Sequence, residues 1–253
     1  MNLFWVINAS NWKRLGFFVL AAFFTAGIVY MEAPSLPVFS DQDKPAALHR
    51  VEAEKPELAL TFDISWGDQE LEPILAALEA EKIDMATFFL SAAWAERHPE
   101  LVQKIVDAGY EIGSHGYKHE HYTTWELEDI KKDMLTAHRV LTELTEEEPT
   151  LIRPPNGSFD DRVLGVAQDL GYQVIHWSVQ TNDWQQPGVE AIVETATTNI
   201  QNGDILHFHA SDSATETAEA MPIVLQRLRE QGYHFVSISR LVSGADVDLD
   251  EAM

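Results

Sequence analysis

The feature that most constrains the fold is a regular alternation of short apolar segments with amphipathic helical stretches, which begins near Leu58. Residues 58–63 are apolar up to a final carboxylate, as in a strand buried on both faces of a parallel sheet. A helical stripe over residues 71–78 and a strand over 86–90 follow, and the alternation continues to a last strand near 234–238. Six or seven such strand–helix units predict an α/β fold whose parallel sheet curls into an irregular (β/α) barrel.

Polar side chains gather where the predicted strands end. They are Asp63, the pair His115 and His119, Arg153, Asp183 and His209. Because ligand sites in parallel α/β folds form at the carboxyl ends of the strands, we expect these side chains to meet in one place. Their convergence predicts an active site.

The histidine pair stands in Gly-Ser-His-Gly-Tyr-Lys-His, directly after a predicted strand. Two imidazoles four residues apart can face the same way on one helical turn and bind a divalent ion. The chain has no cysteine, which excludes thiolate ligands, disulfides and cysteine nucleophiles. We therefore expect His115 and His119 to bind a metal, in preference to being two unrelated loop histidines.

The other polar residues suit acid–base chemistry. Asp63 ends its strand either as a cap or as a general base, and the clustering favours the base. Arg153 precedes Pro-Pro-Asn-Gly in a rigid turn, where it can hold a carboxylate ionised, or serve as a structural ion pair. A carboxylate at Asp183 beside His209 would raise the pKa of the imidazole and fix its tautomer, as a general acid requires. Trp184 is either a core residue or a surface on which a sugar stacks.

These segments, taken in order, resemble the polysaccharide deacetylases with a NodB-like domain. The resemblance covers roughly residues 57–240 and rests on Thr61-Phe62-Asp63, His115-x₃-His119, Arg153-Pro154-Pro155-Asn156-Gly157, Asp183-Trp184 and residues 205–209. The segments Thr-Phe-Asp-Ile-Ser-Trp-Gly-Asp and Gly-Asp-Ile-Leu-His-Phe-His-Ala-Ser are similar to the PdaB-type branch, found in spore-forming bacilli. Members of that branch carry an N-terminal membrane segment.

The resemblance implies metal-dependent hydrolysis of the acetamido bond in an N-acetylated cell-wall polysaccharide, either peptidoglycan or a chitin-like glycan. Zinc is the divalent ion that we expect. The implied roles are general base for Asp63, orientation of that base for Arg153, general acid for His209, tuning of the acid for Asp183, an oxyanion-binding backbone N–H at Asn156, substrate contact for Trp184, and metal ligation for His115 and His119.

Two positions depart from the family pattern. The metal-binding Asp of the family directly follows the base, and this chain has Ile64 there. Asp68 is the candidate replacement ligand, with a helix N-cap before Leu71 as its alternative role. His207 stands where a family Leu helps to form the acetyl pocket, and its imidazole would make that pocket more polar or narrower. These departures keep open a glycan-binding protein with impaired or lost catalysis, and a metal-dependent hydrolase of another C–N bond.

The chain ends are predicted to lie outside the folded domain. Residues 1–14 are expected to be a short cytoplasmic N-terminus, and the uncharged run 15–31 is expected to be a signal anchor, with a cleaved signal peptide as the alternative. Residues 32–56 contain four prolines and no periodicity, which indicates a linker. The catalytic domain is expected over 57–240, before an acidic tail at 241–253.

The net charge of −24 restricts the partners of the protein. An acidic surface repels nucleic acid, so no nucleic-acid partner is expected. The predicted partners are an N-acetylated glycan and the membrane that holds the anchor, with no partner protein, and the protein is expected to be a monomer. We expect an extracytoplasmic, membrane-anchored protein that acts at the cell wall or spore wall, or a secreted protein if the N-terminal segment is cleaved.

Overall fold

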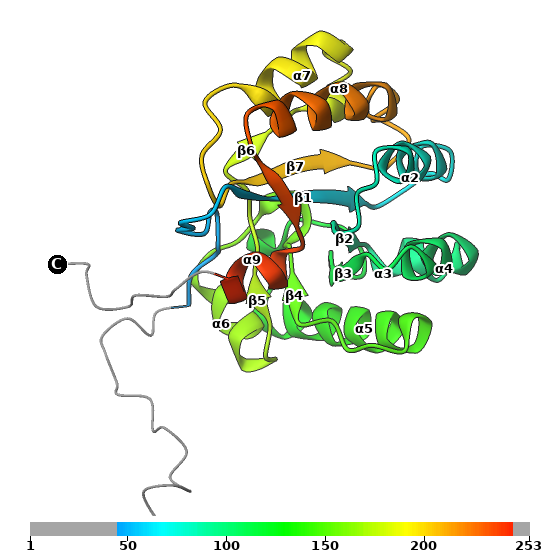
Figure 1. Cartoon of the computed structure of the whole chain (residues 1–253). Helices are drawn as coiled ribbons and strands as arrows, with labels where there is room; N and C mark the ends of the chain where they lie inside the picture. Colours follow the sequence, from blue (N-terminus) through cyan, green and yellow to red (C-terminus); the bar gives the residue numbers. More distant parts are fainter. Residues whose placement is uncertain (1–44, 245–253) are drawn as a thin grey trace, which may run out of the picture. The chain divides into compact units, whose positions relative to one another are not determined.

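Eight parallel strands form the centre of the domain in a computed structural model that describes residues 45–244 (Figure 1). Along the sheet they follow the order β5-β4-β3-β2-β1-β7-β6, and β8 pairs with the first half of β1. In chain order the strands are β1 (Glu57–Ile64), β2 (Thr87–Leu90), β3 (Glu111–Ser114), β4 (Leu151–Ile152), β5 (Gln173–Val174), β6 (Val179–Gln180), β7 (Ile205–His209) and β8 (His234–Val236).

Helices connect most of these strands, as the alternation predicted. Figure 1 shows α7 and α8 along one side of the sheet, next to β6 and β7, and α5 beyond β3 and β4. The helices are α2 (Leu71–Ala80), α3 (Ala92–Ala95), α4 (Pro99–Asp107), α5 (Leu127–Thr145), α6 (Asp161–Asp169), α7 (Val189–Thr197), α8 (Thr217–Glu230) and α9 (Ile238–Gly244), and the 3₁₀ turns are η1 (Tyr122–Thr124), η2 (Pro155–Gly157) and η3 (Asp183–Gln185).

The sheet curls but does not close, so the predicted barrel is an open half-barrel. Within residues 45–244 no strand pair joins β5 to β6, the two ends of the strand order. Both strands are only two residues long, and the next residue after β5, Ile175, forms a parallel bridge with Leu48 instead. The segment around Leu48 therefore takes the place that a closing strand pair would occupy.

The alternation of side chains along β1 decides which of them reach the inside of the curl. Asp63 is paired in register with His209 of β7, and Thr61 is paired with His207, so these residues share one face of the sheet. Phe62 and Ile64 are fully buried on the opposite face, in the apolar core formed with the helices. The sheet thus presents a row of polar side chains on its inner face.

The folded unit extends beyond the predicted range 57–240 on both sides. The Leu48 N–H donates to the carbonyl of Val174 at 2.8 Å, and the Val51 N–H donates to the carbonyl of Gly203 at 3.0 Å. Val51 is buried, and so is Leu241 in α9. Residues 45–56, predicted as part of a linker, are therefore part of the domain.

No helix between residues 45 and 244 is long and apolar enough to cross a membrane. The predicted N-terminus and anchor, residues 1–31, lie outside the described residues. The same holds for residues 32–44 of the predicted linker and for residues 245–253 of the predicted tail.

Candidate active site

Asp63 is the centre of the site and is held by Arg153, as predicted. Arg153 Nη1 donates to Asp63 Oδ1 at 2.7 Å, and Nη2 donates to the carbonyl of His176 at 3.0 Å. The guanidinium is fully buried and lies over the ring of Phe89, 4.2 Å from its centroid. Burial acts to raise the pKa of Asp63, but Arg153, His207 and His115 together outweigh it and hold that pKa well below its usual value. Asp63 is therefore an ionised carboxylate.

Two imidazoles approach the other oxygen of Asp63. His207 Nε2 is 2.8 Å from Asp63 Oδ2, and His115 Nε2 is 3.7 Å from the same atom. Burial lowers the pKa of His207 to about 4, against the opposing effect of Asp63, and burial also lowers the pKa of His115. Both rings are therefore neutral near pH 7.

His209 and Asp183 form the second acid–base pair. His209 Nδ1 is 2.8 Å from Asp183 Oδ1, and the backbone N–H of His209 donates to Oδ2 at 2.8 Å. Thr217 Oγ1 also donates to Oδ2, at 2.7 Å. Burial acts to raise the pKa of Asp183, but the His209 and Thr217 bonds lower it overall. Because the carboxylate only accepts, the proton of a neutral His209 lies on Nδ1, and Nε2 is directed to the site.

His115 and His119 lie close together, as predicted, but on a loop and not on a helical turn. Their ring centroids are 4.9 Å apart, and His119 has a left-handed φ of 56°. The buried Asp133 of α5 shapes this loop, because its carboxylate accepts the N–H groups of Tyr117 at 2.7 Å and Lys118 at 3.2 Å. A distant helix thus fixes the spacing that local helical geometry was expected to supply.

Asp68 does not reach the site, contrary to the prediction that it replaces the missing ligand. Its side chain is exposed and does not line the cavity that contains Asp63. The preceding Gly67 turn is fixed by a hydrogen bond from Trp94 Nε1 to its carbonyl, and the Asp212 carboxylate stands where a Cβ of residue 67 would lie. Asp68 is not the N-cap of α2 either, since that position is held by Glu70.

The Pro-Pro-Asn-Gly turn forms one wall of the site. Asn156 lines the cavity with a left-handed φ of 57°, and Gly157 follows with a φ of 64°. A Cβ at Gly157 would lie 2.7 Å from a ring atom of Trp177 and 2.9 Å from His176 Nε2. Glycine is therefore required here, because the stacked pair of His176 and Trp177 packs against its backbone.

The site opens into a cavity of about 300 Å³ at the carboxyl ends of β1, β3 and β7. Trp184 lines it as predicted and is 45% exposed. Trp66, which was not among the predicted site residues, also lines the cavity and is 51% exposed. An indole in a polar turn directly after a catalytic strand was the signal that could have identified it, since exposed tryptophan is uncommon.

The donor atoms of the site suit a divalent cation. Asp63, His207 and His209 each offer one ligand atom, and these three atoms lie within 4.8 Å of one another. His115 Nδ1 is 2.7 Å from the carbonyl oxygen of Arg153, which fixes the proton on Nδ1 and leaves a lone pair on Nε2. A set of imidazoles and one carboxylate is typical of zinc sites. Asp63, His207 and His115 are therefore candidate metal-binding residues, and His209 can add a fourth donor only where its Nε2 carries no proton.

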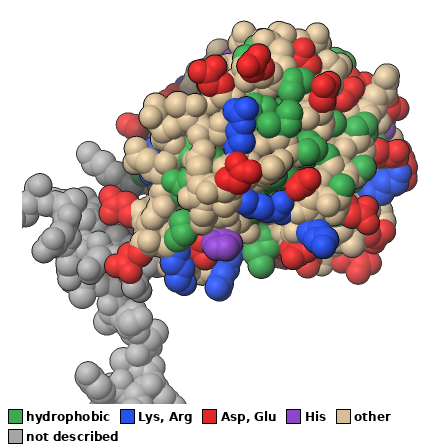
Figure 2. Space-filling view, turned by 45° about the horizontal axis from the view of Figure 1, so that its top comes forward, with side chains coloured by type: hydrophobic (Ala, Val, Ile, Leu, Met, Phe, Trp, Pro, Cys, Tyr) green, Lys and Arg blue, Asp and Glu red, His purple; other side chains and the backbone are tan. Residues whose placement is uncertain are grey.

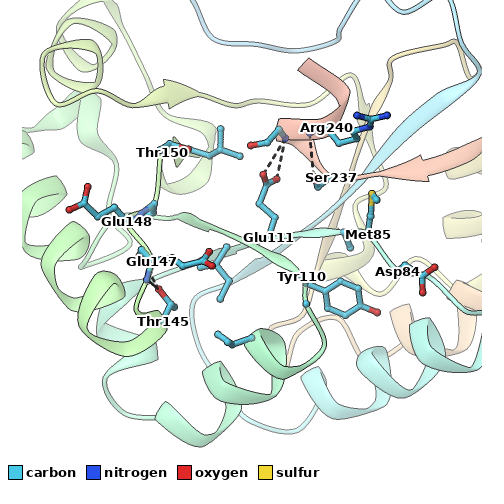
Figure 3. A pocket seen from close by; sticks show the side chains of 17 residues that line it. Asp84, Met85, Tyr110, Glu111, Thr145, Glu147, Glu148, Thr150, Ser237 and Arg240 are labelled. Carbon is cyan, nitrogen blue, oxygen red and sulfur yellow. Dashed lines mark hydrogen bonds between the residues drawn. The ribbon is translucent and has the colours of Figure 1, made fainter. Parts of the chain in front are cut away.

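A second cavity, of about 600 Å³, lies at the opposite ends of the strands (Figure 3). It is lined by acidic residues, including Asp84, Glu147 and Glu148, and by no histidine. Glu111 on its wall accepts hydrogen bonds from Thr87 Oγ1 and from the backbone of Ser239. Acidic side chains also spread over the face seen in Figure 2, with a few Lys and Arg between them. Of these two cavities, only the smaller one is lined by histidines, and the Asp63–His207 and Asp183–His209 pairs lie there.

Comparisons with known proteins agree with this geometry. The polysaccharide deacetylase family profile matches residues 50–175. A peptidoglycan-N-acetylglucosamine deacetylase of Bacillus cereus is 34% identical over 188 residues, which cover 73% of this chain and 87% of that protein. The solved structure of BA3943, a CE4 family pseudoenzyme from Bacillus anthracis, matches with a TM-score of 0.75 at 31% identity, over 81% of this chain and 71% of that one.

A BA3943 mutant with restored enzymatic activity matches equally well, with a TM-score of 0.75 and 32% identity over 80% of this chain and 73% of that one. The similarity to the deacetylase and to both BA3943 structures extends over most of each chain, and the family profile covers the strand that carries Asp63. The half-barrel is therefore shared with these relatives, and this chain belongs to the polysaccharide deacetylase family of hydrolases.

Proposed function

We propose that this protein removes acetyl groups from N-acetylated cell-wall glycans, with peptidoglycan N-acetylglucosamine as the first substrate to test. One observation carries the proposal: two carboxylate–imidazole pairs, Asp63 with His207 and Asp183 with His209, meet at one cavity. Amide hydrolysis needs one group that accepts a proton from water and one that donates a proton to the departing nitrogen.

The residues of the chain divide these tasks. Asp63, kept ionised by Arg153, accepts the proton of the attacking water. His209 donates a proton from Nε2 to the departing amine, and the Asp183 carboxylate, in contact with Nδ1, orients the imidazole for that donation. The backbone at Asn156, on the cavity wall, is the proposed donor to the developing oxyanion.

A divalent cation at the candidate site would polarise the acetyl carbonyl, and zinc suits the imidazole-rich donors best. Removal of the metal should therefore abolish turnover, and added zinc should restore it. The expected measurement is acetate release before and after treatment with a chelator.

The exposed tryptophans support a sugar as the substrate. Trp66 and Trp184 come from different loops and both border the cavity. Indole faces stack on the apolar faces of sugar rings.

The test is acetate release from chitooligosaccharides and from peptidoglycan, with the full-length chain purified in mild detergent and loaded with zinc. We expect turnover by the wild type and a loss of about 100-fold or more for His209→Gln, because a general acid contributes roughly 10²–10⁴-fold. His121→Gln, which changes an exposed histidine outside the cavity, is the matched control. Equal rates for the His209 and His121 variants would contradict the assignment of His209.

A second candidate is a glycan-binding protein without turnover. It is favoured by Ile64, whose buried side chain cannot bind a metal, and by the similarity to the pseudoenzyme BA3943. Binding of a chitooligosaccharide, seen as a change in tryptophan fluorescence, without any release of acetate would select this function.

We further propose that the protein belongs to the PdaB-type branch, acts outside the cytoplasm at the cell wall or spore wall, and is tethered by residues 15–31. The basis is the sequence alone: residues 61–68 and 203–211 support the branch, and the apolar run behind Lys13 and Arg14 supports the tether. Fractionation of cells tests the tether: the chain should stay with the membrane and be digested by protease added from outside.

A further inference from the structure

His207 is placed in an unusual way for a residue that only lines a pocket. It lies on β7, is 3% exposed, and is brought to the inner face of the sheet by its register with Thr61. Its Nε2 is 2.8 Å from Asp63 Oδ2, while its Nδ1 is buried without a hydrogen-bond partner within the described residues. The ring therefore has one nitrogen against the carboxylate and one unsatisfied nitrogen.

Neither neutral tautomer of His207 satisfies the whole ring. With the proton on Nε2, the ring donates to Asp63, and the lone pair on Nδ1 has no donor. With the proton on Nδ1, that N–H has no acceptor, and the lone pair on Nε2 faces a negatively charged oxygen. With the proton on Nδ1, a cation beside Nε2 and Asp63 would turn the repulsive contact into two attractive ones, while the Nδ1–H would still have no acceptor among the described residues.

His115 supplies a second lone pair directed to the same place. Its Nδ1–H donates to the carbonyl of Arg153, so Nε2 is unprotonated and lies 3.7 Å from Asp63 Oδ2. Two acceptor atoms at this distance form no hydrogen bond and repel each other in a buried site. A cation between them removes this repulsion as well.

The ring of His207 is also fixed in the orientation that a ligand needs. It stacks on Trp177, with centroids 4.0 Å apart and an interplanar angle of 23°. Trp177 in turn stacks on His176, at 3.8 Å and 16°. Ligand rings held by such outer contacts lose little freedom when the metal binds.

We propose that His207 is a direct ligand of a divalent cation bound beside Asp63 and His115. The proposal rests on the proposed function only in that it requires a metal. The imidazole of His207 supplies the metal ligand that residue 64 cannot supply, because the Ile64 side chain is packed in the apolar core. Imidazole donors favour zinc over magnesium, calcium and manganese, so the site should prefer zinc.

Zinc binding to the full-length chain, stripped of metal and kept in mild detergent, tests the proposal without any substrate. Affinity is measured by competition with a chromophoric chelator, and stoichiometry by elemental analysis. The variants are His207→Leu and His207→Gln, of which the second keeps a group able to donate to Asp63. His121→Ala is the matched control, since this histidine is exposed and does not line the cavity.

Loss of an outer-shell partner costs about 10–100-fold in metal affinity. We expect both His207 variants to lose more than about 100-fold, with zinc binding by His121→Ala unchanged. A smaller loss in His207→Gln would overturn the proposal, because His207 would then act only through its hydrogen bond to Asp63. Melting temperatures of the metal-free variants show which of them are folded, and the conclusion is drawn from the folded ones.

The two proposals fail in different ways. If His207→Gln keeps its zinc, the ligand assignment is wrong even if the wild type releases acetate. If the wild type binds zinc through His207 but releases no acetate, the ligand assignment holds and the proposed deacetylation fails.

Discussion

At the scale of single residues, the buried charges of the site depend on one another. Arg153 is fully buried, and two of its nitrogens are used by Asp63 and by the carbonyl of His176. Asp63 is also buried, so its charge is tolerated only because the guanidinium faces it. The ion pair therefore orients the proposed base and, as a pair, makes the burial of both charges possible.

Replacement of Arg153 by methionine should destabilise the metal-free protein at pH 7 by about 3–5 kcal/mol, because it leaves a buried carboxylate without its partner. In the wild type the Asp63 pKa is lowered, so the contribution of the pair is complete at neutral pH. In the variant, burial acts without the guanidinium and raises that pKa, so the variant gains stability relative to the wild type as the pH falls.

Urea unfolding at pH 7 and at pH 5 measures this difference. The difference in the free energy of unfolding between Arg153→Met and the wild type should be smaller at pH 5 than at pH 7. Arg139→Met is the matched control, because this exposed arginine pairs with Glu143 on the surface of α5 and should contribute less than about 1 kcal/mol. If this difference in unfolding free energy were larger at pH 5 than at pH 7, the proposed role of the Asp63–Arg153 pair would be contradicted.

At the scale of secondary-structure elements, α5 organises the histidine loop from outside the site. Asp133 accepts hydrogen bonds from the N–H groups of Tyr117 and Lys118 and from the hydroxyl of Tyr122, at 2.7, 3.2 and 2.8 Å. No helix forms between His115 and His119, so these bonds hold the loop in place. The orientation of His119 is therefore set by a helix that contributes no side chain to the chemistry.

Asp133→Asn should weaken this loop while leaving the sheet intact. The amide group cannot accept every bond that the carboxylate accepts, and a hydrogen bond to a charged group contributes about 1.5–3 kcal/mol. We expect a loss of stability in that range and faster hydrogen exchange at the amides of Tyr117 and Lys118. Glu143→Gln, on the exposed face of the same helix, should change neither quantity, and equal exchange in both variants would refute the role of Asp133.

At the scale of the whole molecule, residues 45–56 close the open edge of the half-barrel. Leu48 bridges to Ile175 next to β5, and Arg50 pairs with the buried Asp204 just before β7. A Cβ at Gly203 would lie 1.7 Å from the carbonyl oxygen of Val51, so this segment packs directly against the backbone of the domain. The segment thus bridges parts of the sheet that no strand pair connects.

A chain that starts at Glu57 should therefore be less stable than one that starts at Pro45. Burial of Val51 alone contributes about 1.5–3 kcal/mol, and the loss of Arg50 leaves a buried carboxylate unpaired. For a domain of this size, a loss of about 3 kcal/mol lowers the melting temperature by roughly 6–12 °C. Calorimetry of the two chains measures the difference, and equal melting temperatures would place the boundary at Glu57 after all.

The sequence by itself determined the strands, the helices and the chemistry of the strand ends. Period and composition are local properties, so the alternation from Leu58 onward was sufficient to predict a parallel α/β sheet. The carboxyl ends of parallel strands lie at one edge, which is why Asp63, Arg153 and His209 were expected together and are found together.

Only the tertiary structure decided which donor atoms meet. Asp68 is close to Asp63 in sequence, but the fixed turn at Gly67 leaves it exposed and outside the cavity, whereas His207 is brought to the base by strand register. No strand pair joins β5 to β6, and the residue after β5, Ile175, pairs instead with Leu48, in a segment that looks like a linker when taken alone. These outcomes depend on contacts between residues far apart in the chain, and the free energy of such contacts is not encoded in any local pattern.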